Sequence, residues 1–176
     1  MQEQAEDAAA VLRALAPGGA IVAGAGFGAL IALDLLLRHS SLVSAAVLCD
    51  TPLLALVPDA ARALAEQRVE LEEAVRLGGP EAGVASWLGG GADGERIERA
   101  QRSAGAFFAD YAGLASWPVT RRELRELGAP VVVLTGPATP PHVLAASDAL
   151  TALLPAAARR TDGDLTGAVG ELLARA

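Results

Sequence analysis

The chain has 176 residues and a mass of 17.8 kDa, a length that suits one domain with a sizeable core. Its 14 basic residues are all arginine and face 21 acidic residues, which gives a net charge of −7 and argues against nucleic-acid binding, because phosphate contacts need clustered basic side chains. One cysteine and two histidines exclude an intrachain disulfide and a cysteine-rich metal site, and we expect no metal and no cofactor.

The hydrophobic content of 52% and the mean hydropathy of +0.37 require that a membrane span be considered. The longest apolar run, residues 20–37, is close to the roughly 20 residues that a spanning helix needs. However, Asp34 interrupts this run, three glycines crowd its first half, and no arginine cluster flanks it. The N-terminus is acidic and polar, unlike a secretory signal. We therefore expect a cytoplasmic, non-membrane protein.

The first third of the chain alternates helical and strand patterns. Residues 3–16 are good helix formers with acids early and Arg13 late. The short apolar runs 20–24 and 44–50 are typical of buried parallel strands, and the almost wholly apolar segment 26–39 between them reads as a helix. Two strands joined by a helix predict a right-handed βαβ unit.

The middle of the chain changes character. Residues 59–77 form a charged amphipathic helix that should stop at Gly78-Gly79-Pro80, and a second amphipathic stretch after Asp93 carries most of the aromatic residues. The alternation then resumes with a helix at 120–127, a strand at 130–136, a helix at 142–154, a weaker strand at 157–161 and a helix at 165–175.

These elements predict an α/β fold with a mostly parallel sheet of about four strands, flanked by helices. No repeat and no long linker divides the chain. We predict a single domain over residues 1–176 with a helical insertion at about 53–127.

One glycine-rich turn, VAGAGFGALIAL, carries chemical content. The first interpretation is a dinucleotide (FAD or NAD) site, in which Gly24-x-Gly26 lets a pyrophosphate approach the helix N-terminus and Asp50 ends the next strand. Against it, Asp50 lies 26 positions after Gly24, beyond the usual interval of about 20 residues, and Ala29 stands at the third glycine. Glycines in a tight strand-to-helix turn are the plainer explanation.

The second interpretation is a nucleophile elbow, G-x-S-x-G, with residues 24–28 in its five places. From here the whole chain resembles the α/β-hydrolase fold superfamily. EDAAAVLRAL resembles the helix before the elbow strand, and RHSSLVSAAVLCDTPLLALVPD resembles the family's RHP-type helix end, next strand and proline-rich exit. Residues 59–127 are similar to the helical cap over the active site, and GAPVVVLTGPATPPHVLAASDALTALLP resembles the late strand and helix that deliver the catalytic acid. Because the resemblance covers nearly the whole chain, we favour this interpretation.

The resemblance implies a Ser, Asp or Glu, and His triad, and the sequence departs from it at each place. Gly26 stands at the nucleophile position and has no side chain. The acid loop, residues 136–141, holds no carboxylate, and Asp164 stands where the family has its catalytic histidine. We therefore assign no catalytic residue and treat Gly26 and Asp164 as degenerate triad positions.

A remaining pocket is expected at the turn and the neighbouring strand ends. Its candidate residues are Gly24, Ala25, Phe27, Asp50, Thr139 and His142. For Asp50, capping of nearby backbone N–H groups is the plainer role. His142 and His39 read as solvated helix-end residues, Cys49 as inert core, and the aromatic residues of the insertion as packing.

The resemblance also implies a shortened sheet, because the family has about four strands before the elbow strand. The strand at 20–24 would then lie at an uncovered edge, and uncovered edges template pairing with other chains. We expect a homo-oligomer, such as a homodimer, or a heteromer that covers this strand, and a small apolar ligand under the cap.

Together these observations predict a catalytically degenerate α/β-hydrolase-fold protein, a pseudoenzyme that acts as a structural or small-molecule-binding module. The first alternative is an active, esterase-like hydrolase with substitute residues or with a site completed by a partner chain. The second is dinucleotide binding through Gly24-x-Gly26.

Overall fold

A computed structural model describes residues 2–57, 60–89, 94–114 and 117–175. The chain forms two compact units, one made of Met1–Pro58 and Pro118–Ala176, the other of Asp59–Trp117. The second unit lies within the predicted insertion of about 53–127. The cap role of this insertion stays a prediction.

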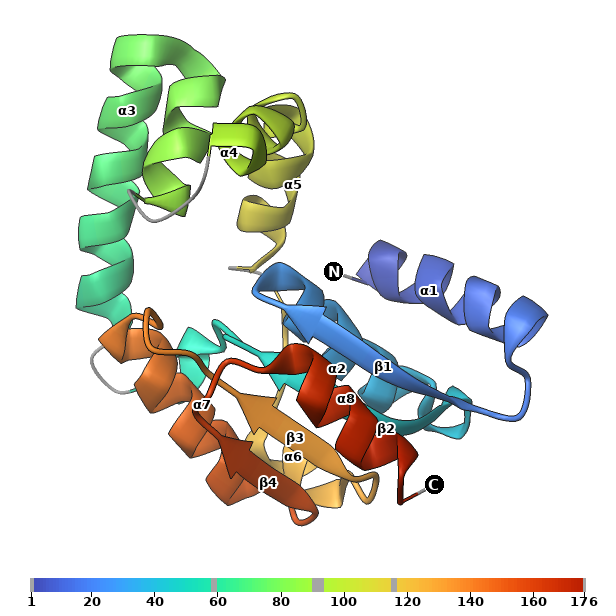
Figure 1. Cartoon of the computed structure of the whole chain (residues 1–176). Coiled ribbons are helices and arrows are strands. Elements are labelled where there is room, and N and C mark those ends of the chain that lie inside the picture. The colour runs from blue at the N-terminus through green and yellow to red at the C-terminus, as the bar shows by residue number, and fades with distance from the viewer. Residues whose placement is uncertain (1, 58–59, 90–93, 115–116, 176) are drawn as a thin grey trace. The chain divides into compact units, whose positions relative to one another are not determined.

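The first unit is built on a parallel sheet of four strands in the order β1-β2-β3-β4 (Figure 1). The strands are β1 (Ala20–Ala25), β2 (Val43–Cys49), β3 (Val131–Leu134) and β4 (Ala157–Arg160). All four residues of β3 are buried, as expected for an apolar strand covered on both faces. The predicted α/β class with about four parallel strands is confirmed.

Five α-helices and two 3₁₀ turns accompany the described sheet. They are α1 (Gln2–Leu15), α2 (Phe27–Arg38), η1 (Ser40–Leu42), η2 (Leu54–Leu56), α6 (Arg121–Glu126), α7 (Pro141–Leu153) and α8 (Leu165–Leu173). On one face of the sheet, Ala168 and Leu172 of α8 pack against buried residues of β2 and β3. Helix α2 contacts β1 and β2 and buries most of its length.

The apolar run 20–37 is divided between β1 and α2. Each piece is therefore much shorter than a bilayer requires. Within the described ranges, no helix combines the length and the hydrophobicity that a membrane crossing needs.

The second unit is helical, with α3 (Ala60–Leu88), α4 (Gly94–Gln101) and α5 (Ala104–Leu114). The predicted end at residues 78–80 is wrong: Gly79, with φ 79° and ψ −178°, kinks α3, and the helix resumes at Pro80. A proline is well placed there because the first residue of a helical segment needs no N–H partner. The stretch predicted after Asp93 divides into α4 and α5.

An aromatic cluster holds this unit together. The rings of Phe107 and Tyr111 meet that of Trp87 edge to face, with centroids 5.6 and 5.2 Å apart, and Phe107 meets Phe108 at 5.1 Å. Such pairs add about 0.5–1.5 kcal/mol each to the burial of the rings. These aromatic residues therefore pack against one another, as the sequence interpretation favoured.

Candidate functional site

The turn between β1 and α2 has the backbone of an elbow. Gly26 has φ 56° and ψ −122°, a conformation that side chains of L-residues rarely adopt. A Cβ atom built on Gly26 would have no neighbour within 4 Å. The nucleophile position is therefore open, sharply turned and without a functional group.

Gly24 and Gly28 explain how the elbow closes. A Cβ atom on Gly24 would lie 2.2 Å from the carbonyl oxygen of Gly28 and 2.3 Å from its carbonyl carbon. Only glycine at position 24 lets the strand approach the first turn of α2 this closely. The G-x-x-x-G spacing is thus a steric requirement of the turn. Beside it, Ala25 is exposed and Phe27, the first residue of α2, is partly buried.

Asp50 and Thr139 meet at the carboxyl edge of the sheet although 89 positions separate them. The Thr139 hydroxyl donates to Asp50 Oδ1 at 2.5 Å and accepts the N–H of Gly136 at 2.8 Å. Asp50 itself has φ 47°, a left-handed conformation that aspartate tolerates better than most residues. Two of the predicted pocket residues are therefore brought together and partly buried.

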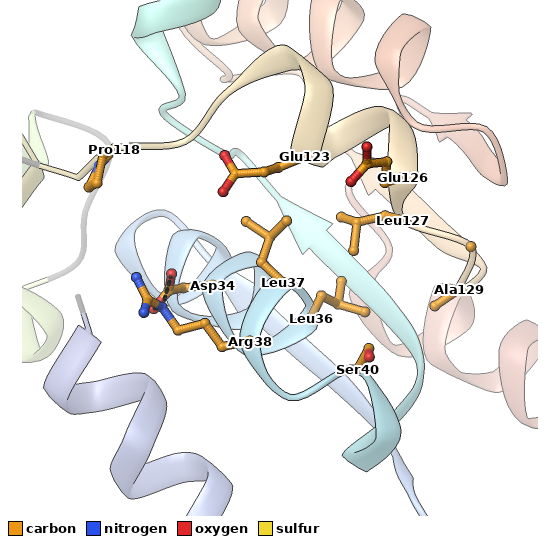
Figure 2. Close-up of a pocket in the computed structure, with 11 residues that line it drawn as sticks. Asp34, Leu36, Leu37, Arg38, Ser40, Pro118, Glu123, Glu126, Leu127 and Ala129 are labelled. Carbon is orange, nitrogen blue, oxygen red and sulfur yellow. Dashed lines mark hydrogen bonds and ion pairs between the residues drawn. The ribbon is translucent and has the colours of Figure 1, made fainter.

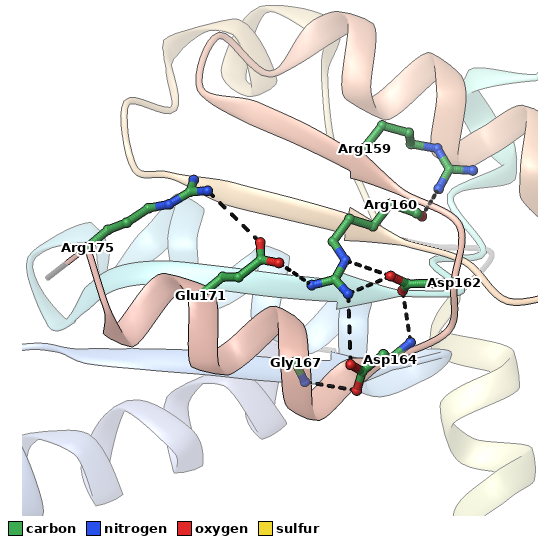
Figure 3. Close-up of polar contacts among 7 residues, drawn as sticks. All are labelled: Arg159, Arg160, Asp162, Asp164, Gly167, Glu171 and Arg175. Carbon is green, nitrogen blue, oxygen red and sulfur yellow. Dashed lines mark hydrogen bonds and ion pairs between the residues drawn. The ribbon is translucent and has the colours of Figure 1, made fainter.

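Asp164, the residue at the predicted histidine place, is the N-cap of α8. Its Oδ1 accepts the N–H of Gly167 at 2.9 Å. Figure 3 shows that it also belongs to an ionic cluster around Arg160, whose side chain is 19% exposed. Arg160 donates to Asp162 and Glu171 and holds the pKa of the Asp162 carboxyl below its usual range. Asp164 thus has a structural task of its own.

The two histidines lie in different places. His39 follows α2 and precedes β2, so it belongs to the amino edge of the sheet; its ring contacts Glu6 Oε1 at 3.0 Å and Arg13 at 3.3 Å. His142 is in the first turn of α7, near the carboxyl edge. In the described ranges, no carboxylate bonds to the His142 ring, so it lacks the orienting partner of a triad base.

Two buried threonines at this edge were not identified from the sequence. Thr51 and Thr135 are 0% exposed, and their hydroxyls have no hydrogen-bond partner in the described part of the chain. A buried hydroxyl without a partner costs about 1–3 kcal/mol. Each comes directly after the carboxyl end of a buried strand or one residue later, and that placement of a polar residue is the signal that could have found it.

Cys49, the last residue of β2, is a poor nucleophile. Burial raises the pKa of its thiol to about 11, and the Asp50 carboxylate contributes through its charge and by accepting the thiol hydrogen bond. The thiolate is the reactive form of cysteine, so Cys49 does not replace the missing serine at neutral pH. This agrees with the inert role expected from the sequence.

We expect the rate of Cys49 alkylation by iodoacetamide at pH 8 to be roughly a hundredfold below that of a thiol with an ordinary pKa. Asp50→Asn should speed the reaction because it removes the neighbouring charge, and Asp164→Asn, a matched change in another loop, should not. Because the folded pKa lies above the unfolded value of 9.0, the thiol's contribution to stability is complete below pH 9 and is lost as pH rises toward 11. Labelling at pH 8 as fast as in urea-unfolded protein would contradict this prediction.

A cavity of about 530 Å³ lies elsewhere in the first unit, between the C-terminal half of α2 and α6 (Figure 2). Asp34 and Arg38 face each other in its wall: Arg38 Nε donates to both Asp34 carboxylate oxygens, at 2.9 and 3.0 Å. None of the six predicted pocket residues lines this cavity. The carboxyl edge, where those residues lie, is the better candidate site because the elbow and the Asp50–Thr139 pair meet the same edge of the sheet.

Among the described residues, no group of three or more histidine, cysteine, aspartate or glutamate side chains is arranged to hold a metal ion.

Solved structures share this architecture. Similar ones are a carboxylesterase structure from Nitrososphaera gargenis (17% identity, TM-score 0.72), an alpha/beta hydrolase from Sphaerobacter thermophilus (18%, 0.66) and a thermophilic esterase from Thermogutta terrifontis (22%, 0.66). They match 99%, 97% and 97% of this chain but only 71%, 72% and 71% of their own. No protein-family model matches the sequence, and no curated protein matches it significantly. Identities this low show the fold alone: the chain has a partial α/β-hydrolase fold.

Proposed function

We propose that this α/β-hydrolase-fold protein is catalytically degenerate and acts as a structural or small-molecule-binding module. The observation that carries the proposal is Gly26, which keeps the elbow backbone at φ 56° and ψ −122° but offers no nucleophile. An oxygen or sulfur nucleophile, a base and an orienting acid act as a unit in this chemistry, so the loss of one member removes most of the rate.

The neighbouring groups support the same proposal. Asp164 caps α8, and the Cys49 thiol stays protonated at neutral pH. What the carboxyl edge offers instead is polar contact: the Asp50–Thr139 pair and the buried hydroxyls of Thr51 and Thr135. These groups suit hydrogen bonding to a small molecule better than bond cleavage.

The test is an assay with p-nitrophenyl esters of increasing chain length together with labelling by a fluorophosphonate probe. We expect ester turnover no faster than the buffer blank and no labelling, for the native chain and equally for Asp50→Ala and Asp164→Ala. Gly26→Ser restores a hydroxyl at the open elbow position but no base, so its rate should stay far below that of a working triad.

Turnover by the native chain that Asp50→Ala or Asp164→Ala abolishes would instead establish the active-hydrolase alternative. Native mass spectrometry of the purified protein tests the binding role: a small molecule retained by the native chain should be lost in Asp50→Ala. If that molecule is a nicotinamide or flavin dinucleotide, the dinucleotide alternative is the correct one.

A further inference from the structure

The two edges of the four-stranded sheet are built differently. At the β4 edge, Arg159 and Arg160 carry charge into the strand and form ion pairs with Asp148, Asp162 and Glu171 (Figure 3). Charged side chains on an edge strand oppose pairing with another sheet. The β1 edge has the sequence AIVAGA, with no charge and no proline over its six residues. By this criterion β4 is protected against pairing and β1 is not.

The outward-facing backbone of β1 is available for a ladder. The N–H of Gly26 donates to the Cys49 carbonyl on β2, and backbone groups of successive strand residues point to alternate sides. The N–H and C=O groups of Ile21, Ala23 and Ala25 therefore face away from β2. In the sheet that the structure describes, β1 pairs with β2 alone, and Ala23 and Ala25 are exposed.

Large exposed hydrophobic side chains of this unit gather on the two helices next to β1. They are Val11 and Leu15 on α1, 56% and 80% exposed, and Leu173 on α8, 63% exposed. Helix α8 contacts β1, and α1 leads into it through the turn at residues 16–19 (Figure 1). Val11 and Leu15 are four residues apart and share one helix face. Apolar surface thus borders the open strand.

We propose that β1 pairs antiparallel with β1 of a second copy of this chain, so that two four-stranded sheets join into one across a two-fold axis. Three observations favour this occupant. An uncharged strand is complementary to itself, whereas a charged edge would select a partner of opposite charge. The strands match in length, and a two-fold interface brings Val11 and Leu15 of both copies to the same boundary. This inference does not depend on the absence of catalysis.

Sedimentation velocity between 1 and 100 µM tests the pairing. The native chain should sediment as a species of twice 17.8 kDa. Ala23→Lys places two like charges in the new ladder and should weaken dimerisation at least about tenfold, and so should Leu15→Glu, which changes an exposed helix position without burying charge. Ala158→Lys, the matched change at an exposed position of β4, should leave the dimer unchanged.

Amide hydrogen exchange gives a second readout that misfolding does not imitate. The N–H groups of Ile21, Ala23 and Ala25 should exchange more slowly at 100 µM than at 1 µM, with no such change in β4. A monomer at 100 µM overturns the proposal. So does a dimer that withstands Ala23→Lys or Leu15→Glu, or one that Ala158→Lys disrupts; if the native chain is monomeric and pairs only with another protein, the second-copy assignment is equally wrong.

Discussion

Gly24→Ala is expected to destabilise the first unit by about 3 kcal/mol or more, and to reduce the yield of folded protein. The added methyl group would lie 2.2 Å from the Gly28 oxygen and 2.7 Å from the Ala29 nitrogen. Both are backbone atoms of α2, which cannot move aside as a flexible side chain would. The helix must shift away from β1, and backbone shifts forced by overpacking cost about 1–3 kcal/mol and occasionally more. Urea denaturation measures the loss.

Two other glycines of the same turn provide matched controls. At Gly28 a Cβ atom meets no neighbour within 4 Å, so Gly28→Ala should be neutral or stabilising by up to about 1 kcal/mol through its higher helix propensity. At Gly26 the space is equally open but φ is 56°, so Gly26→Ala should cost about 1–2 kcal/mol from backbone strain alone. The expected order of destabilisation is Gly24, Gly26, Gly28. Equal effects at positions 24 and 28 would contradict the close approach of β1 and α2.

Arg38→Leu is expected to cost about 2–3 kcal/mol because it removes the ion-pair partner of a buried carboxylate. The Asp34 side chain is 2% exposed and that of Arg38 is 37% exposed. Breaking a buried pair from one side costs about 3–5 kcal/mol, since the remaining charge is left in a poorly solvated place. The partial exposure of Arg38 reduces this, because water can reach the site. Urea denaturation again measures the effect.

The control for Arg38 is an ion pair with the same spacing on another helix of the same unit. Arg122 and Glu126 are also four residues apart, but their side chains are 87% and 62% exposed. Arg122→Leu should therefore cost less than about 0.5 kcal/mol. The double variant Asp34→Asn/Arg38→Leu should recover part of the loss, because no charge is then left buried. A loss at Arg38 no larger than that at Arg122 would show that Asp34 is not held by this pair.

Much of the fold was predictable because its signals are local. The apolar runs at 20–24 and 44–50 are short and rich in valine and alanine, and they form β1 and β2. The kink in α3 was missed because Gly78-Gly79-Pro80 is an ordinary helix stop. What overrides it is the positive φ of Gly79, which absorbs the change of direction and lets the helix continue from Pro80.

The candidate site was predictable only in part. The elbow was found because its glycines are neighbours in sequence. The Asp50–Thr139 contact was not, because it depends on the left-handed turn at Asp50 and on two loops that meet only in the folded sheet. Asp164 was placed by family order at a triad position, whereas the structure gives it a capping bond to Gly167.

By itself, the sequence determined the order of helices and strands, the parallel class of the sheet and the absence of a nucleophile at position 26, since periodicity and residue identity suffice for these. Only the tertiary structure decided that Gly24 is sterically obligatory, that the Asp34 carboxylate is buried, and that β1 and β4 form the open and the charge-protected edges of the described sheet. These three properties depend on distances between elements. Such distances are set by the packing of the whole unit, and no local pattern of residues specifies them.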